Sequence, residues 1–139
     1  QVENGDIVKL YPGKPHVFDK APSGRLYLDG NISVAEDAPS IKDRKNLSAN
    51  GYIEATILIT AKGNIHKRPV LTFRGIPVVD VDEFVYGLED VIEKVTRSFK
   101  LGSKKQEYNL IDALKIACRK FSKEQTGKKP FTNINLVKI

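Results

Sequence analysis

The chain has 139 residues, of which 40% are hydrophobic and 29% charged, so it is long enough for one ordinary globular core and too short for two. No apolar run reaches eighteen residues, and the start lacks the basic and apolar blocks of a secretory signal, which predicts a cytoplasmic protein without a membrane span. The formal charge of +6 either favours a polyanionic partner or serves solubility. Because methionine is absent even from position 1, we expect a piece of a longer protein.

Glycine or proline interrupts the first thirty residues every few positions, so that only short strands fit between the breaks. The β-prone candidates are residues 6–11, 16–18 and 25–28. These strands need a sheet to join, and we expect none within the segment itself. Residues 31–39 have little periodicity and indicate a linker, after which Ser40 or Asp43 is a candidate cap for a short helical turn over residues 41–47.

A clear domain pattern begins at Gly51. Residues 52–61 alternate apolar and polar side chains with a period of two, as in a strand buried on one side. Gly63 allows the chain to reverse, and residues 65–73 are the expected return strand of an antiparallel pair. Pro69 has no amide hydrogen to donate, which places this second strand at an edge of the sheet or at a bulge.

Two helices should follow. Apolar side chains recur at three- and four-residue steps over residues 81–100, with Asp80 as the cap. A second helix is predicted over residues 110–124, capped by Asn109 and ended by Gly127, and a last β-type run covers residues 131–139. The order β-β-α-α-β predicts an α+β domain: a small three-stranded sheet covered on one face by two helices and preceded by an extended segment and linker.

The chain offers few groups for catalysis. Its two histidines, His16 and His66, lie in different segments and belong to no metal-binding motif, so we expect no catalytic or metal-binding residue here. The single cysteine, Cys118, fits a reducing compartment and lies beside the apolar stripe of the second helix, which favours a buried core residue over a reactive thiol. Arg74 is expected to pair with a carboxylate such as Asp80 or Asp82.

Basic residues cluster along the second helix and just after it. Lys115, Arg119 and Lys123 are four residues apart and therefore share one stripe, and Lys128 with Lys129 follows the helix. The stripe is a candidate contact for RNA phosphates, which bind lysine and arginine largely without regard to base sequence. The alternative is a solvated outer face, which the lack of interleaved aromatic residues favours.

Five short stretches of the chain carry a family resemblance: residues 4–6 (NGD), 22–30 (PSGRLYLDG), 41–51 (IKDRKNLSANG), Arg74-Gly75 and residues 123–139 (KEQTGKKPFTNINLVKI). In this order and spacing they resemble the end of the bacterial ribonuclease J family, and the resemblance spans nearly the whole chain. Asp43 and Arg44, within the Asp-Arg-Lys unit of residues 43–45, are candidate structural residues.

Three stretches of the chain depart from the family pattern. Residues 31–40 are rich in Ala, Glu and Asp where family members often carry glycine. Phe73-Arg74-Gly75-Ile76 stands where many have Ser-Arg-Gly-Phe, and Lys128-Lys129-Pro130 replaces Arg-Arg-Pro. These departures leave the expected fold intact and weaken predictions of specific contacts at those positions.

The resemblance implies a parent enzyme with a metallo-β-lactamase domain, an inserted β-CASP domain and a two-zinc site that degrades RNA from the 5′ end and also cleaves internally. The zinc ligands would lie upstream of Gln1, so no cofactor is expected in this chain. Residues 1–30 then resemble the last strands of the lactamase domain and the start of the linker, residues 31–39 the linker, and residues 40–139 the C-terminal domain. That domain is implied to support the catalytic core and to form a homo-oligomer. An RNA-binding module that uses the basic helix face is the alternative.

Overall fold

The computed structural model describes all residues 1–139, which form two compact units, Gln1–Asp43 and Arg44–Ile139. We call these the N-terminal and C-terminal units. The N-terminal unit contains β1 (Asp6–Lys9), β2 (His16–Lys20), β3 (Leu26–Asp29) and β4 (Ile32–Ala35). Helix α1 (Pro39–Asn50) runs across the boundary between the units. None of the three helices has the length and apolar character that a membrane crossing requires.

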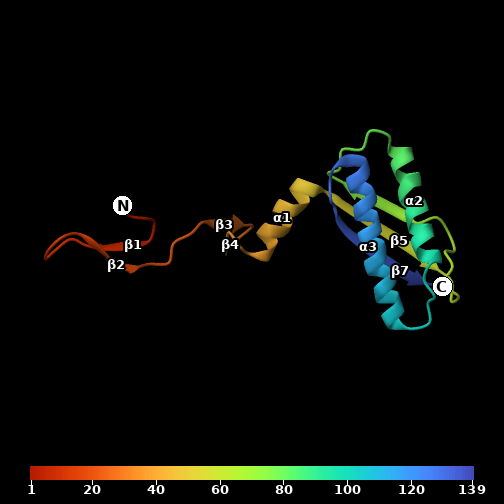
Figure 1. Ribbon diagram of the computed structural model, residues 1–139, viewed down its shortest axis with the longest axis horizontal. Helices are drawn as coiled ribbons and strands as arrows, with labels where there is room; N and C mark the ends of the chain where they lie inside the picture. The colour runs from red at the N-terminus through yellow and green to blue at the C-terminus, as the bar shows by residue number, and fades with distance from the viewer. The chain divides into compact units, whose positions relative to one another are not determined.

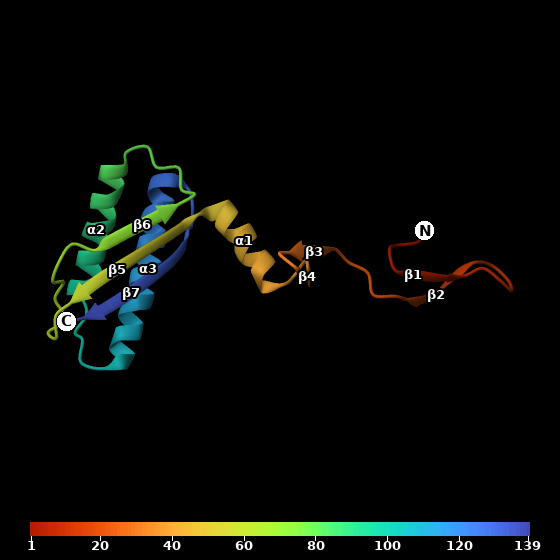
Figure 2. The ribbon, with the colours of Figure 1, turned by 180° about the vertical axis from the view of Figure 1, so that it is seen from behind.

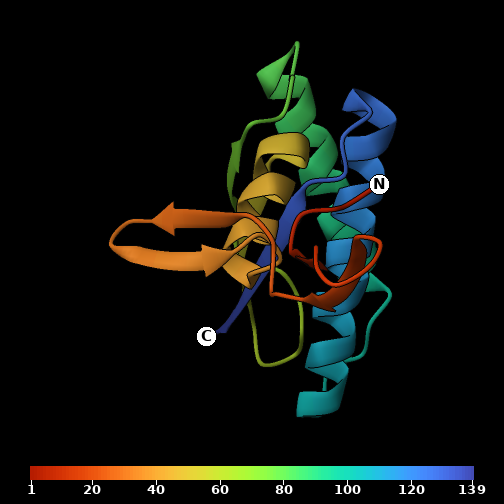
Figure 3. The same ribbon diagram turned by 90° about the vertical axis from the view of Figure 1, so that its left-hand side faces the viewer.

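The strands of the N-terminal unit pair with each other, so the expectation that they lack a sheet of their own was wrong. Strand β1 pairs antiparallel with β2, and β3 pairs antiparallel with β4 to form the orange hairpin of Figure 3. The expected linker over residues 31–39 therefore contains a strand. The cause is the turn at Gly30, whose φ of 63° lets the chain reverse between Asp29 and Ile32, and this Asp-Gly hairpin signal is readable in the sequence.

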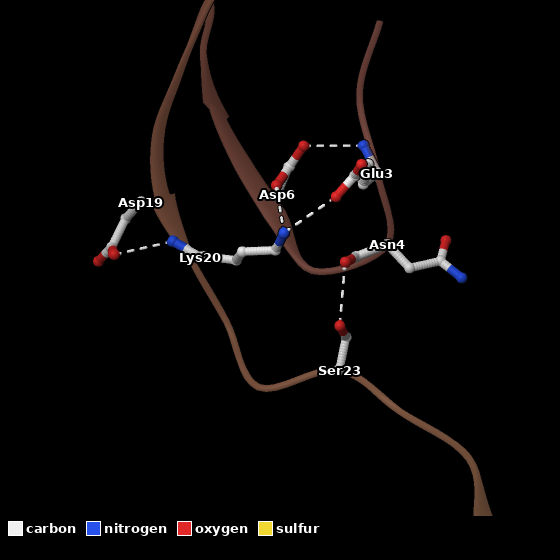
Figure 4. A network of polar contacts seen from close by, with 6 residues as sticks. All are labelled: Glu3, Asn4, Asp6, Asp19, Lys20 and Ser23. Carbon is white, nitrogen blue, oxygen red and sulfur yellow. Dashed lines mark hydrogen bonds and ion pairs between the residues drawn. The ribbon is translucent and has the colours of Figure 1, made fainter.

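A polar network holds the two ends of the β1–β2 hairpin together (Figure 4). The Lys20 ammonium lies 3.1 Å from the Glu3 carboxylate and 3.8 Å from that of Asp6, which also accepts a 2.7 Å bond from the Glu3 amide. The Ser23 hydroxyl donates to the Asn4 carbonyl at 3.0 Å. Most of these groups are exposed, so they set the local geometry more than they stabilise it.

The C-terminal unit contains the predicted α+β fold. Its elements are β5 (Tyr52–Ile59), β6 (Val70–Arg74), α2 (Val81–Arg97), α3 (Lys104–Thr126) and β7 (Phe131–Lys138). The sheet order is β6-β5-β7, with β5 antiparallel to β6 and parallel to β7. Both α2 and α3 lie on one face of the sheet (Figure 1). The other face is seen from the front in Figure 2.

The core lies between the sheet and these helices. Every second residue of β5 is fully buried, as its alternating sequence predicts, and meets a row of side chains spaced four residues apart along each helix. Those rows are Phe84, Leu88, Ile92 and Thr96 on α2, and Leu110, Leu114, Cys118 and Ser122 on α3. Thr96 tolerates burial because its hydroxyl donates to the Ile92 carbonyl at 2.8 Å.

Element ends differ from the expectation where a local signal was missed. Helix α3 begins at Lys104, well before the predicted start, because Ser103 caps it by accepting from the Gln106 amide and Gln106 reaches back to the Gly102 amide. Strand β6 begins only after Pro69, and α1 is longer than the predicted turn. The edge position of β6 and the Asp80 cap of α2 are confirmed.

Three element ends meet at Gly51. Its amide donates to the Leu47 carbonyl at 2.8 Å, ending α1, and its carbonyl accepts from the Phe131 amide at 2.9 Å, starting β7. A Cβ on Gly51 would lie 2.6 Å from the Arg74 carbonyl oxygen and 2.8 Å from that of Gly75. Two of the sequence stretches that resemble the ribonuclease J family, the one ending at Gly51 and Arg74-Gly75, therefore touch at a glycine-to-glycine contact.

Candidate functional site

The sheet face that α2 and α3 leave uncovered is the first candidate surface, and we call it the open face. Strand register determines its members, because residues paired across neighbouring strands point to the same side. It consists of Tyr52, Glu54, Thr56 and Leu58 from β5, Val70, Thr72 and Arg74 from β6, and Phe131, Asn133, Asn135 and Val137 from β7.

Polar groups occupy the centre of the open face. The Glu54 carboxylate accepts from the Asn135 amide at 2.9 Å and from the Asn133 amide at 3.5 Å. The Asn133 amide also lies 3.3 Å from the Asn135 side-chain oxygen, and Asn135 contacts the Thr56 hydroxyl at 3.5 Å. These bonds join β5 to β7 and hold the amide groups in fixed positions.

Aromatic and aliphatic side chains flank this centre. At one end the rings of Tyr52 and Phe131 stack with centroids 6.0 Å apart and planes 16° from parallel. Burial, followed by the charge of Glu54, raises the pKa of Tyr52 above its usual value, so the hydroxyl stays protonated at neutral pH. Phe131, Val70 and Val137 remain 51%, 63% and 44% exposed, which is a large apolar exposure for one small face.

Only two of the eleven open-face residues carry charge, Arg74 and Glu54, and their charges cancel. The expected ion pair of Arg74 with Asp80 or Asp82 is not formed. The Asp80 carboxylate instead caps α2 by accepting from the Glu83 amide at 3.0 Å, while the Arg74 guanidinium lies 3.5 Å from its neighbour's carbonyl, that of Phe73. Arg74 therefore remains available on an electrically balanced surface.

The second candidate surface is a depression of about 470 Å³ at the C-terminal half of α3, which we call the basic depression. Arg119, Lys120, Lys123 and Lys129 line it together with Ile116, whose side chain is 65% exposed. No acidic side chain belongs to its lining. The nearest carboxylate contact is that of Glu124, 3.9 Å from the Lys120 ammonium.

The structure brings three of the five predicted RNA-contact residues together in this depression: Arg119, Lys123 and Lys129. Lys115 is half-buried and does not line it, and Lys128 turns away to donate to the Ala49 carbonyl at 2.7 Å. Lys120 and Ile116 line the depression but were not predicted to. Their spacing in the sequence could have predicted this, because residues 116, 119, 120 and 123 recur at steps of three and four and so form one helical face.

Arg119 also fixes the shape of the depression. Its Nε donates to the Pro130 carbonyl at 3.2 Å, which ties the side of α3 to the residue before β7. This contact leaves the two terminal amino groups of the guanidinium for an external partner. The Nε group of Arg119 is therefore used within the protein, and only its two terminal amino groups, which we call its free end, are available for an anion.

The remaining predicted residues do not form a site. Asp43 and Arg44 lie exposed on α1. Both histidines are exposed and belong to separate units, and no group of three or more His, Cys, Asp or Glu side chains gathers as metal ligands would. The donor set of this chain therefore does not fit the two-zinc centre that the family resemblance implies for the parent enzyme.

Cys118 is a core residue. Its side chain is fully buried, and burial raises the pKa of the thiol from 9.0 to about 12. Because the thiolate is the reactive form, the folded protein keeps this cysteine inert at neutral pH.

Comparison with known proteins agrees with the fold. The family model of the ribonuclease J C-terminal domain matches residues 39–138. Over 144 aligned positions the chain is 25% identical to ribonuclease J of Sinorhizobium meliloti, and the alignment covers 100% of this chain and 25% of that protein. The chain thus spans about a quarter of the length of this curated relative. Its match over most of its residues shows that the chain belongs to the ribonuclease J C-terminal domain family.

Proposed function

We propose that this chain comes from the C-terminal part of a zinc-dependent ribonuclease J and that its C-terminal unit holds copies of the enzyme together. Catalysis, by 5′ exonucleolytic and internal cleavage of RNA, is assigned to zinc ligands in polypeptide that precedes Gln1. The occupant proposed for the open face is the same face of a second copy. The observation that carries the proposal is the exposed apolar and aromatic surface on a sheet face that no helix of the C-terminal unit covers.

The open face suits a second copy of itself because a two-fold interface brings the same patch together twice. Such a patch must supply both partners of each contact. The open face does so, since it offers Arg74 and asparagine amides as donors, Glu54 as acceptor, and the Tyr52–Phe131 pair for ring contacts. With one positive and one negative charge it does not repel its copy. Tyrosine, phenylalanine and arginine are also the residues enriched at protein interfaces.

The size of the face limits the affinity. The eight-residue strands β5 and β7 are each about 26 Å long and the five-residue strand β6 about 17 Å, so at about 4.8 Å of width per strand the flat area is roughly 330 Å². Stable interfaces bury about 800 Å² on each partner. Self-association of this chain alone should therefore be weak, and the rest of the enzyme would add contact area.

The N-terminal unit supports the view that polypeptide outside this chain is needed. Its two hairpins expose large apolar side chains, and an isolated two-stranded hairpin is marginally stable at best. We infer that these side chains pack against the metallo-β-lactamase domain, to which residues 1–30 would contribute the last strands. The side chains more than 60% exposed are Val2, Leu10, Tyr11, Phe18, Leu26, Leu28 and Ile32.

Sedimentation equilibrium of the 139-residue chain tests the proposed role of the open face. We expect a concentration-dependent monomer–dimer equilibrium for the unmodified chain. The double variant Val70→Glu/Phe131→Glu should weaken dimerisation at least tenfold, because it removes apolar contacts and places like charges opposite each other. Both side chains are exposed, so the fold should tolerate the change.

The matched control is Val79→Glu/Tyr108→Glu, which adds the same charge at side chains that are 104% and 68% exposed and lie outside the open face. This control should dimerise like the unmodified chain. A chain that stays monomeric at the highest concentration reached would contradict the proposal. So would equal weakening by both double variants.

A further inference from the structure

The positive charge of this protein is concentrated in one place. Residues 115–129 contain six lysines and arginines and one acid, Glu124, so this stretch carries a net charge of +5 out of the +6 of the whole chain. Four of the six cations line the basic depression. The charge is therefore not an even coat that serves solubility but a local patch on the C-terminal half of α3 and the turn after it.

We propose that the basic depression binds the sugar-phosphate backbone of single-stranded RNA, independently of base sequence. The choice of RNA rests on the proposed function of the parent enzyme; the preference for a polyanion rests only on this patch. Phosphates would lie against Lys120, Lys123, Lys129 and the free end of Arg119. The exposed Ile116 side chain offers an apolar contact for a ribose or a base edge.

The cations of the depression are available for phosphates. Neither Lys123 nor Lys129 has a carboxylate partner. The contact of Lys120 with Glu124 is long, at 3.9 Å, and joins two exposed side chains, so a phosphate competes with it at little cost. On α2, by contrast, the exposed bases Lys94 and Arg97 pair with acids four residues earlier on the same helix.

The shape favours a flexible single strand. A volume of about 470 Å³ lies within the range of small-ligand sites and holds a short piece of backbone rather than a duplex. Lys120 and Lys123 lie on α3, whereas Lys129 follows its end, so the depression takes its cations from both the helix and the turn after it. The open face has no net positive charge, because its two charges cancel. The two surfaces therefore suit partners of different chemistry.

Fluorescence anisotropy with a labelled polyuridylate of about twelve nucleotides tests the inference, at salt concentrations between about 50 mM and 200 mM. Four phosphate contacts on a single strand predict a slope of log K against log salt of about −2.8. The triple variant Lys120→Ala/Lys123→Ala/Lys129→Ala should bind at least tenfold more weakly at the lowest salt, with a slope near −0.7. Single-stranded DNA of the same length should bind within about threefold of RNA, because phosphate contacts do not read the 2′ hydroxyl.

The matched control removes the same charge elsewhere. Lys67→Ala/Lys100→Ala/Lys105→Ala alters three exposed lysines outside the depression and should leave affinity within about twofold. Circular dichroism checks that both triple variants are folded. We expect both to fold, because alanine is tolerated at exposed positions. Absence of binding at the lowest salt, unchanged binding by the depression variant, or an equal loss in both variants would overturn the inference.

The same samples separate this inference from the assembly proposal. The depression variant should sediment like the unmodified chain, and Val70→Glu/Phe131→Glu should retain RNA binding. Loss of RNA binding by the open-face variant would count against a separate site, whatever its effect on mass.

Discussion

Replacing Gly51 by alanine is expected to lower the free energy of unfolding of the C-terminal unit by about 3 kcal/mol or more, the largest effect we foresee for a single methyl group. Gly51 has a φ of 79°, which strains any residue with a side chain. The added Cβ would also lie 2.6 Å from the Arg74 carbonyl oxygen, and this backbone atom moves only if the end of β6 moves. Chemical denaturation followed by circular dichroism measures the loss.

Gly127→Ala is the control for the strain alone. Gly127 ends α3 with a φ of 74°, and nothing lies within 4 Å of the position that its Cβ would take. This variant should lose only about 1 to 2 kcal/mol. Equal losses in the two variants would show that the crowding at Gly51 has no energetic consequence, contrary to the packing described.

Leu88→Ala should lower the free energy of unfolding by about 2 to 5 kcal/mol, because it removes a fully buried side chain from the middle of α2 and leaves a cavity between the helix and the sheet. Val81→Ala on the same helix is the control. Its side chain is 54% exposed, so its loss should cost only a few tenths of a kcal/mol. The midpoints of thermal unfolding give the comparison, and similar shifts for both variants would contradict the placement of the core.

Val81 and Thr96 show where periodicity stops being informative. Both lie on α2, and the apolar repeat predicts Val81 inside and leaves Thr96 out, whereas the structure exposes Val81 and buries Thr96. The repeat correctly identifies the helix and its central contacts, Phe84, Leu88 and Ile92. It fails at the ends: Val81 is the first residue of the helix and precedes the first buried one, Phe84, whereas Thr96 is polar and enters the core because its hydroxyl bonds to the Ile92 carbonyl.

Local turn and cap signals in the sequence determine two element ends that periodicity alone does not predict. Ser103 and Gln106 form a capping pair that starts α3 ahead of the expected Asn109, and the Asp-Gly sequence before Asn31 forms the turn between β3 and β4. These are local chemical effects, so a sequence carries them fully. Hydrophobic periodicity alone misplaces the start of α3 and misses β4, yet it correctly predicts the three-stranded sheet and its two covering helices.

The candidate surfaces were predictable to different degrees. Linear spacing indicates the stripe through Arg119 and Lys123, since helix geometry alone places these residues together. It does not reveal that Lys128 bonds to Ala49 or that Lys115 is half-buried, because both depend on elements distant in sequence. The open face required the register of three strands, and its parallel β5–β7 pairing joins residues about eighty positions apart.

The mass of the intact enzyme in solution shows directly whether the open face joins copies of the protein. Light scattering would compare the unmodified enzyme with the Val70→Glu/Phe131→Glu and Val79→Glu/Tyr108→Glu variants, numbered as in this chain. We expect that only the open-face variant falls to a smaller assembly while its circular dichroism spectrum stays unchanged. An open-face variant that keeps the full mass of the unmodified enzyme would contradict it.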